Sequence, residues 1–167
     1  MVRVERLGED DWAVFRGIRL RSLLESPDAF GSTYGEESSQ PEQAWRDWAA
    51  GRWRGGTAVV FAGRAEDATL VGTATGAEYE AEPAVAHVYA MWVAPDARGA
   101  GVGRSLLDAV RAWAQDRGCG RLALTVTETN AVARAFYGAC GLVETGDRAP
   151  LREGSALGGL TMIKELR

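Results

Sequence analysis

The chain has 167 residues, of which 46% are hydrophobic and 25% are charged, and its formal net charge is −4. A chain of this length predicts a single domain, residues 1–167, that can bury a sizeable core, and its acidity argues against a general binder of nucleic acids or anionic membranes. No apolar run approaches the ~18 residues of a membrane span, and residues 1–6 are too polar for a secretory signal.

Hydrophobic periodicity predicts strands and helices along the whole chain. Strands are indicated where apolar residues alternate or run together, and helices where apolar residues recur at three- and four-residue steps. Pro, Gly and Asn mark most boundaries, and Asn130 can cap a helix that stops at Gly141. The predicted strands cover residues 2–7, 57–63, 69–79, 87–93, 121–127, 142–145 and 160–166. The predicted helices cover residues 9–27, 41–51, 103–117 and 130–141, with loops at 27–38 and 146–157.

The second of these helices carries two further predictions. Ser39 and Glu42 stand at capping-box spacing, so the helix is expected to begin near Pro41. Trp45 and Trp48 lie three residues apart and share its inner face, and we interpret both as core residues rather than as a platform for a ligand.

The elements follow one another in the order β-α-α-β-β-β-α-β-α-β-β. This order predicts an α/β (α+β) fold, in which helices cover both faces of a mixed, largely antiparallel twisted sheet of about seven strands. No linker divides the chain into two domains.

Cysteine and histidine usage indicates a protein without a metal. Cys119 and Cys140 give neither metal-ligand spacing nor a disulfide framework. His87 is the single histidine, which argues against a zinc site. Reduced thiols are the default of cytosolic proteins, so we expect a cytoplasmic location.

The stretch from Arg98 to Arg104 lies between a predicted strand and a predicted helix. Its three glycines allow close approach to the backbone, successive N–H groups can converge on one point, and the helix start adds partial positive charge. The two arginines can pair with phosphate oxygens. These features predict a diphosphate site, and the alternative is a turn that needs glycine for packing alone.

Other phosphate-binding motifs do not match this turn. A dinucleotide fingerprint would need a third glycine where Arg104 or Leu106 stands, and a Walker loop would need a lysine. A nucleotide-binding protein with a different glycine turn stays open as an alternative.

The turn reads R-x-x-G-x-G over Arg98 to Gly103, which resembles the central motif Q/R-x-x-G-x-G/A of the GCN5-related N-acetyltransferases (GNAT family). A second signature follows in Leu124 to Asn130 and then in the Phe136-Tyr137 pair ahead of Gly141-Leu142. The segment from Leu20 to Ser32 is similar to the family's first helix and following loop. The predicted order of elements is also that of the family.

The resemblance implies acetyl-coenzyme A (acetyl-CoA) as co-substrate, without a metal. In the family the glycine turn binds the pyrophosphate, and the splayed central strand pairs with pantetheine and donates an N–H to the oxyanion. Carried over to this chain, the turn residues are Arg98, Gly99, Ala100, Gly101, Val102, Gly103 and Arg104, and the strand residues are Met91, Trp92 and Val93.

Two further roles are implied for the later helix. Tyr137 matches the tyrosine that serves as general acid toward the sulfur, and Asn130 matches an asparagine that contacts the cofactor. The alternatives are a half-buried tyrosine with a solvated hydroxyl, and an asparagine that is only an N-cap.

The general base is left open. His87 falls where several family members place a glutamate, and a reference pKa near ~6.5 suits a base at neutral pH, although a structural role is the alternative. Glu78, Glu80 and Glu82 share a face if their strand continues, and they form either a solvated rim or a base acting through water. Arg16, Arg19 and Arg21 are interpreted as solvated helix positions; the alternative, implied by the resemblance because the family's acceptor site lies near this helix, is contact of one of them with an anionic substrate.

The function implied is an acetyl-CoA-dependent N-acetyltransferase that acetylates a primary amine by direct attack. The alternative from another class is a non-catalytic acyl-CoA-binding regulatory module. The acceptor is a small-molecule amine or a peptide or protein amine, selected by the loops at 27–38 and 146–157. Dimers are common in the family, so a homodimer is one expectation.

Overall fold

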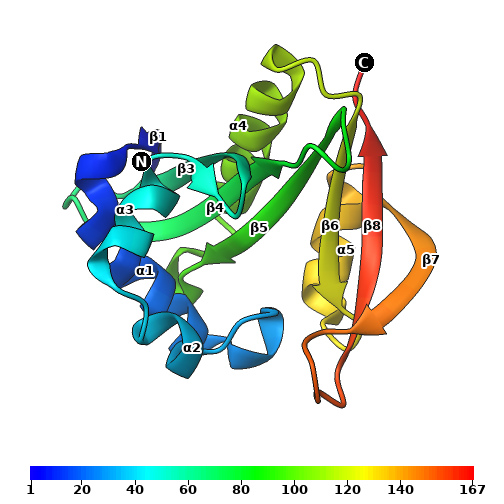
Figure 1. Cartoon of the computed structure of the whole chain (residues 1–167), viewed down its shortest axis with the longest axis horizontal. Coiled ribbons are helices and arrows are strands. Elements are labelled where there is room, and N and C mark those ends of the chain that lie inside the picture. Colours follow the sequence, from blue (N-terminus) through cyan, green and yellow to red (C-terminus); the bar gives the residue numbers. More distant parts are fainter.

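The computed structural model describes all 167 residues and is built around one sheet of eight strands (Figure 1). The strands are β1 (Arg3–Leu7), β2 (Arg52–Trp53), β3 (Gly56–Arg64), β4 (Leu70–Glu78), β5 (Val85–Val93), β6 (Arg121–Thr127), β7 (Val143–Pro150) and β8 (Gly158–Glu165). Their order across the sheet is β1-β3-β4-β5-β6-β8-β7, with β2 paired to β3 alone. Every neighbouring pair is antiparallel except β5 and β6. The expected mixed, largely antiparallel sheet is therefore confirmed.

Helices cover both faces of this sheet. They are α1 (Trp12–Glu25), α2 (Tyr34–Ser38), α3 (Glu42–Ala49), α4 (Val102–Asp116) and α5 (Ala131–Ala139), with 3₁₀ turns η1 (Glu9–Asp11), η2 (Pro27–Ala29) and η3 (Pro95–Ala97). A Cβ on Gly76 of β4 would lie 2.8 Å from Val110, so this face of the strand packs against α4. The other face meets α1, where Arg21 Cζ lies 5.2 Å from the ring centroid of Trp92. One core of 30 buried residues joins these layers.

The parallel strands β5 and β6 pair only at one end. Residues 85–87 stand opposite residues 121–123, and the pairing does not continue beyond His87. From there the strands separate, and Figure 1 shows the angle that opens between them. The edge of β5 beyond His87 therefore faces this angle instead of a neighbouring strand.

The region expected to be a loop, residues 27–38, contains η2 and α2. A capping box begins α2, in which the Glu36 N–H donates to Thr33 Oγ1 at 3.3 Å and the Thr33 N–H donates to Glu36 Oε2 at 2.8 Å. The capping box expected at Ser39 is wrong, because α3 begins after Pro41 without a side-chain cap. The T-x-x-E pattern at the start of α2 supplies hydrogen-bond acceptors for two backbone N–H groups, in a segment whose turn residues predicted only a loop.

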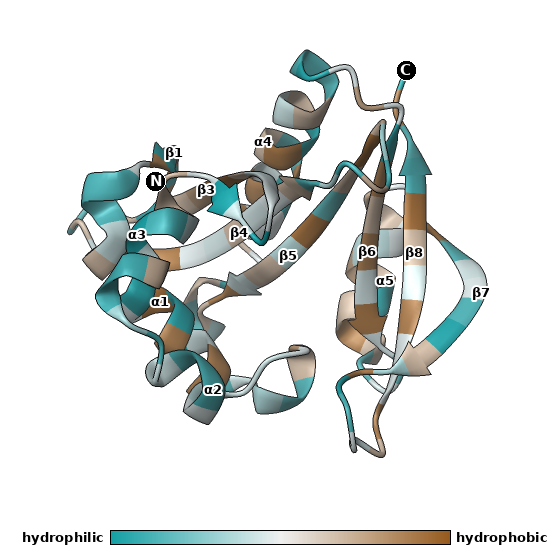
Figure 2. Cartoon of the chain, in the orientation of Figure 1, coloured by the Kyte–Doolittle hydropathy of each residue, from teal (hydrophilic) through white to brown (hydrophobic).

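The loop expected over residues 146–157 is shorter, since β7 continues to Pro150. All eight residues of β7 are exposed, so no apolar alternation marks the strand. It lies at the sheet edge, and its pairing with β8 is irregular between Glu144 and Arg148. Figure 2 shows hydrophobic residues recurring along β5, β6 and β8, whereas most of β7 is pale or hydrophilic. None of the helices combines the length and the apolar character that a bilayer span requires.

Candidate active site

Two glycines with left-handed backbone shape the turn between β5 and α4. Gly99 has φ +80° and Gly101 has φ +82°, values that residues with a side chain rarely adopt. No atom lies within 4 Å of a Cβ built on either glycine, so the space above the turn is open. Gly103 differs, because its Cβ would lie 3.2 Å from the Phe136 ring and 3.4 Å from the Met91 methyl. Packing explains the third glycine, whereas the first two leave room for a ligand.

Six consecutive backbone N–H groups, from Gly99 to Arg104, donate no hydrogen bond within the chain. The next N–H, that of Ser105, donates to the Gly101 carbonyl at 3.0 Å. Unpaired N–H groups at the start of a 15-residue helix, with the positive end of its dipole behind them, attract anions. This turn provides the surroundings that a diphosphate needs.

Both arginines that flank the turn make contacts within the chain. Arg98 donates to the Val93 carbonyl at 2.9 Å and to Glu25 Oε2 at 3.0 Å. Arg104 donates to the Ala139 carbonyl at the end of α5, at 3.2 Å. A guanidinium has five N–H donors, so each side chain is held beside the turn and keeps donors for an anion. Phosphate contact by the two arginines stays a prediction.

A bulge interrupts β5 where it separates from β6. Ala90 has φ +51°, and the pairing with β4 slips between Thr73 and Thr75. Bulges redirect a strand, and a residue other than glycine at positive φ is strained. Beyond the bulge, residues 91–93 run along the free edge of β5, where a ligand that carries amides can pair as an additional strand.

Tyr137 is buried on α5, beside the beginning of α4. Its ring centroid lies 5.2 Å from that of Phe136, which in turn lies against Gly103. Burial raises the pKa of the Tyr137 hydroxyl, and the neighbouring Cys140 adds to the shift. The hydroxyl is therefore protonated at neutral pH and is available as a hydrogen-bond donor.

Asn130 caps α5, as the sequence predicts. Its Oδ1 accepts a hydrogen bond from the Ala133 N–H at 3.1 Å. This contact uses the oxygen and leaves the side-chain N–H groups for another partner, so capping and a contact with a ligand are compatible.

His87 lies on the face of β5 opposite α4, because the adjacent Val88 pairs with Gly76, which packs on α4. Its Nε2 lies 2.9 Å from Glu82 Oε2, although the geometry is not that of a hydrogen bond. The Tyr89 ring is stacked on the same face at 6.2 Å between centroids. His87 therefore has a carboxylate neighbour within ion-pair distance.

The strand that would place the three glutamates on one face does not continue through them. β4 ends at Glu78, so Glu80 and Glu82 belong to the following loop and the alternation does not reach them. Glu78 forms an ion pair with Arg117 at the end of α4. Glu82 is the one that comes close to His87.

A pocket of about 380 Å³ opens in the angle between β5 and β6. His87 and Tyr89 form its wall on β5, with Glu82 beside them, and the opposite wall includes Thr125 of β6 and Asp147 of β7. Burial raises the pKa of Tyr89, so its phenol is neutral at neutral pH. Because His87 and Tyr89 face away from α4, the pocket and the glycine turn lie on opposite sides of the splayed strands.

A comparison with known protein families covers both the glycine turn and β5. The model of the Acetyltransferase (GNAT) family matches residues 20–142, which include the glycine turn, β5 and Tyr137. The chain belongs to the GNAT acetyltransferase family.

The curated relatives of this chain match it in part. The mycothiol acetyltransferase of Rhodococcus opacus (strain B4) is 32% identical over 139 residues, which are 81% of this chain and 43% of the relative. The aminoglycoside N(6')-acetyltransferase type 1 of Stenotrophomonas maltophilia is 46% identical over 54 residues, which are 32% of this chain and 35% of the relative. The chain therefore spans less than half the length of these relatives.

Solved structures share the fold of this chain. yncA of Salmonella typhimurium, solved with its cofactor acetyl-CoA, matches with a TM-score of 0.78 over 100% of this chain and 95% of that chain. The sequence identity is 18%, so this likeness shows the GNAT fold alone.

Glu25 is a residue of the candidate site that the sequence did not reveal. It ends α1, and its Oε2 accepts from Trp92 Nε1 at 2.8 Å and from Arg98. Hydrogen bonds from Ser26, Trp92 and Arg98 lower the pKa of Glu25. The carboxylate thus holds the strand edge and the glycine turn against α1, through contacts that no local pattern signals.

Two further pocket residues, Tyr89 and Asp147, were not predicted from the sequence. Tyr89 could have been predicted, because it alternates with His87 and must share its face of the strand. Asp147 lies where a loop was expected, so its position on a strand beside the pocket was not predicted. No group of three or more His, Cys, Asp or Glu side chains is arranged to hold a metal ion.

Proposed function

We propose that this acetyltransferase transfers the acetyl group of acetyl-CoA to a primary amine by direct attack, with residues 1–167 forming one N-acetyltransferase domain. The observation that carries the proposal is the row of unpaired N–H groups from Gly99 to Arg104 beside the free edge of β5. A diphosphate suits the first feature and an amide-bearing arm suits the second, and acetyl-CoA has both.

The reaction has two proton transfers, and residues on opposite sides of the splayed strands carry them out. Acetyl-CoA supplies an acetyl thioester, whose C–S bond breaks as the amine nitrogen bonds to the acetyl carbon. His87 accepts the proton that the amine loses and passes it to solvent beside Glu82. Tyr137 donates its proton toward the departing sulfur, so that coenzyme A leaves as a thiol, and then regains a proton from solvent.

The backbone of β5 supplies the remaining contribution. An N–H among residues 91–93 would hold the acetyl oxygen as negative charge develops on it, next to the bulge at Ala90. Because this donor belongs to the backbone, replacing a side chain there would test it poorly. No residue of the chain needs to become acetylated.

The acceptor is proposed to be a small molecule. The two matched relatives are named for mycothiol and for aminoglycosides, which are small molecules. The pocket of about 380 Å³ lies near the lower end of the size range of small-ligand sites.

The test is an acceptor screen with the purified chain, acetyl-CoA and a panel of amines. We expect acetyl-CoA to raise the melting temperature, and at least one amine to cause thiol release with a matching acetylated product. Stabilisation without turnover on any amine would favour the non-catalytic acyl-CoA-binding module. Tighter binding of ATP or NAD than of coenzyme A would overturn the assignment.

A further inference from the structure

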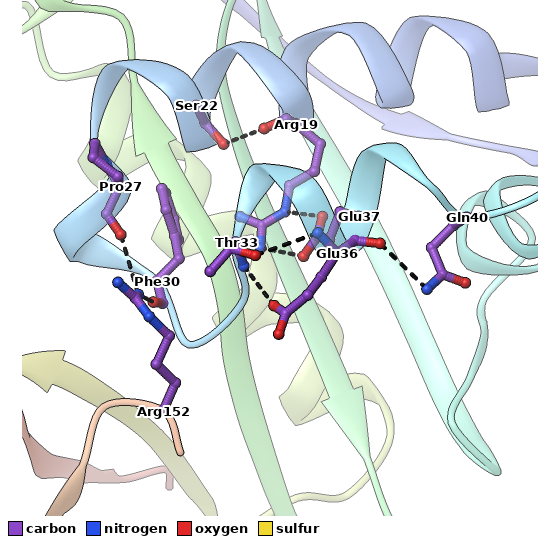
Figure 3. Close-up of polar contacts among 9 residues, drawn as sticks. All are labelled: Arg19, Ser22, Pro27, Phe30, Thr33, Glu36, Glu37, Gln40 and Arg152. Carbon is purple, nitrogen blue, oxygen red and sulfur yellow. Dashed lines mark hydrogen bonds and ion pairs between the residues drawn. The ribbon is translucent and has the colours of Figure 1, made fainter. Parts of the chain in front are cut away.

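A segment of chain closes the wide end of the angle between β5 and β6. We call this segment, residues 26–33, the strap. At the far end of β6, Thr127 Oγ1 donates to the Asp28 carbonyl at 2.6 Å. From the β7–β8 loop, Arg152 Nη1 donates to the Phe30 carbonyl at 2.8 Å and to a second strap carbonyl at 3.3 Å (Figure 3). The strap therefore joins the two arms of the splayed sheet.

A buried ion pair anchors the strap at its other side. Arg19 of α1 donates from Nε and Nη2 to the two oxygens of Glu37 of α2, at 2.8 and 2.7 Å (Figure 3). The solvated position expected for Arg19 is wrong, since both side chains are only 8% exposed. Arg19 Cζ also lies 4.5 Å from the ring centroid of Phe30. The strap is therefore held on both sides of the wide end of the angle.

The charges that line the pocket are predominantly negative. Its arginine, Arg121, is paired with Glu165 at 2.7 Å. Neither Glu82 nor Asp147 pairs with an arginine, and the contact to a side chain that Asp147 makes is from the Thr145 hydroxyl at 3.1 Å. The two carboxylates come from opposite walls, so a ligand with two separated positive charges can meet both.

Aromatic rings complete the wall on β5. Tyr89 is 37% exposed, and its ring lies next to those of His87 and Tyr79. Tyr79 is held in turn by Trp53, whose Nε1 donates to its hydroxyl at 2.7 Å. Aromatic rings beside carboxylates favour cations over neutral or anionic ligands.

We propose, building on the proposed function, that the acceptor is a small molecule with at least two amino groups and not a polypeptide. One amino group reacts beside His87, and the second stays protonated and binds the Asp147 carboxylate. The strap lies across the wide end of the angle, in the path of a chain laid along it, while the face lined by Glu82 and Asp147 is open to a compact dication. Diamines, polyamines and diamino sugars share this chemistry.

The test compares kcat/KM for matched acceptors, followed by thiol release. The panel contains 1,5-diaminopentane, pentylamine of the same chain length, spermidine, a diamino sugar, and two peptides offering an N-terminal alanine or a lysine. We expect kcat/KM for at least one diamine or diamino sugar to exceed kcat/KM for pentylamine by about tenfold. Both peptides should have a lower kcat/KM than that diamine or diamino sugar. The order of kcat/KM for spermidine and the diamino sugar shows which of these two kinds of dication the site prefers.

Asp147→Asn should reduce that preference, by raising KM for the diamine more than KM for pentylamine. Asp116→Asn, which removes an exposed acid at the end of α4, is the matched control and should leave both acceptors unchanged. Equal rates on diamine and monoamine, a preference for either peptide, or an unaltered preference in Asp147→Asn would overturn this inference alone. Absence of thiol release from every acceptor would instead overturn the proposed function, and the inference with it.

Discussion

Removing the charge of Glu37 should destabilise the protein strongly, because this carboxylate is buried against Arg19. Both side chains are 8% exposed, and two hydrogen bonds join them. Arg19 Nη1 is buried without an acceptor, so no other group compensates the guanidinium. In Glu37→Gln the amide oxygen can keep one of the two hydrogen bonds. Breaking a buried ion pair costs about 3–5 kcal/mol, and the retained hydrogen bond places the expected loss at about 3 kcal/mol.

Urea unfolding followed by circular dichroism measures this loss, with a thermal scan as a second readout. A chain of this size loses roughly 2–4 °C in Tm per kcal/mol, so we expect a decrease of about 6–12 °C. Glu42→Gln removes an exposed ion pair with Arg46 and serves as the control, with little expected change. A loss below about 1 kcal/mol in Glu37→Gln, or equal losses in the two variants, would refute the argument from burial.

Three further predictions concern the site and its surroundings. Tyr137→Phe should lower kcat by about tenfold or more, with nearly unchanged affinity for acetyl-CoA. Tyr34→Phe, at an exposed position of α2, should change neither quantity. An unaltered kcat of Tyr137→Phe in steady-state assays would exclude Tyr137 as the acid. Gly101→Val should weaken acetyl-CoA binding in calorimetry, because φ is +82° and the side chain would enter the open space; tight binding would count against a diphosphate at this turn. The free energy of unfolding should also depend on pH. Hydrogen bonds from Ser26, Trp92 and Arg98 lower the pKa of Glu25, so its contribution is full above the unfolded pKa of about 4.3 and is lost as pH falls through the lower folded value. The free energy of unfolding in urea should therefore decrease between about pH 5 and pH 3, and a constant value over that range would contradict the assignment.

Most of the fold was predictable because its elements carry periodic apolar residues. The strand over residues 121–127 has the predicted boundaries, and α4 buries the side chains whose three- and four-residue spacing indicates a helix. The parts that were missed lack this signal. The second half of β7, residues 146–150, is exposed throughout, and α2 has only five residues, with Glu37 as its buried side chain.

The site divides in the same way between local and distant contacts. The glycine turn, Asn130 and Tyr137 stand in short motifs, so the sequence singles them out. The strap depends on contacts between residues far apart in the chain, 99 residues for Thr127 with Asp28 and 122 residues for Arg152 with the Phe30 carbonyl. Only the folded chain brings such groups together, which is why the closure of the angle was not foreseen.

A crystal structure of the complex with coenzyme A would test the central claim most directly. The diphosphate is expected within hydrogen-bond distance of the N–H groups between Gly99 and Arg104, with the pantetheine arm along the free edge of β5 and the sulfur near Tyr137. Coenzyme A bound at another surface, or a turn that closes and leaves no space for the diphosphate, would contradict the account.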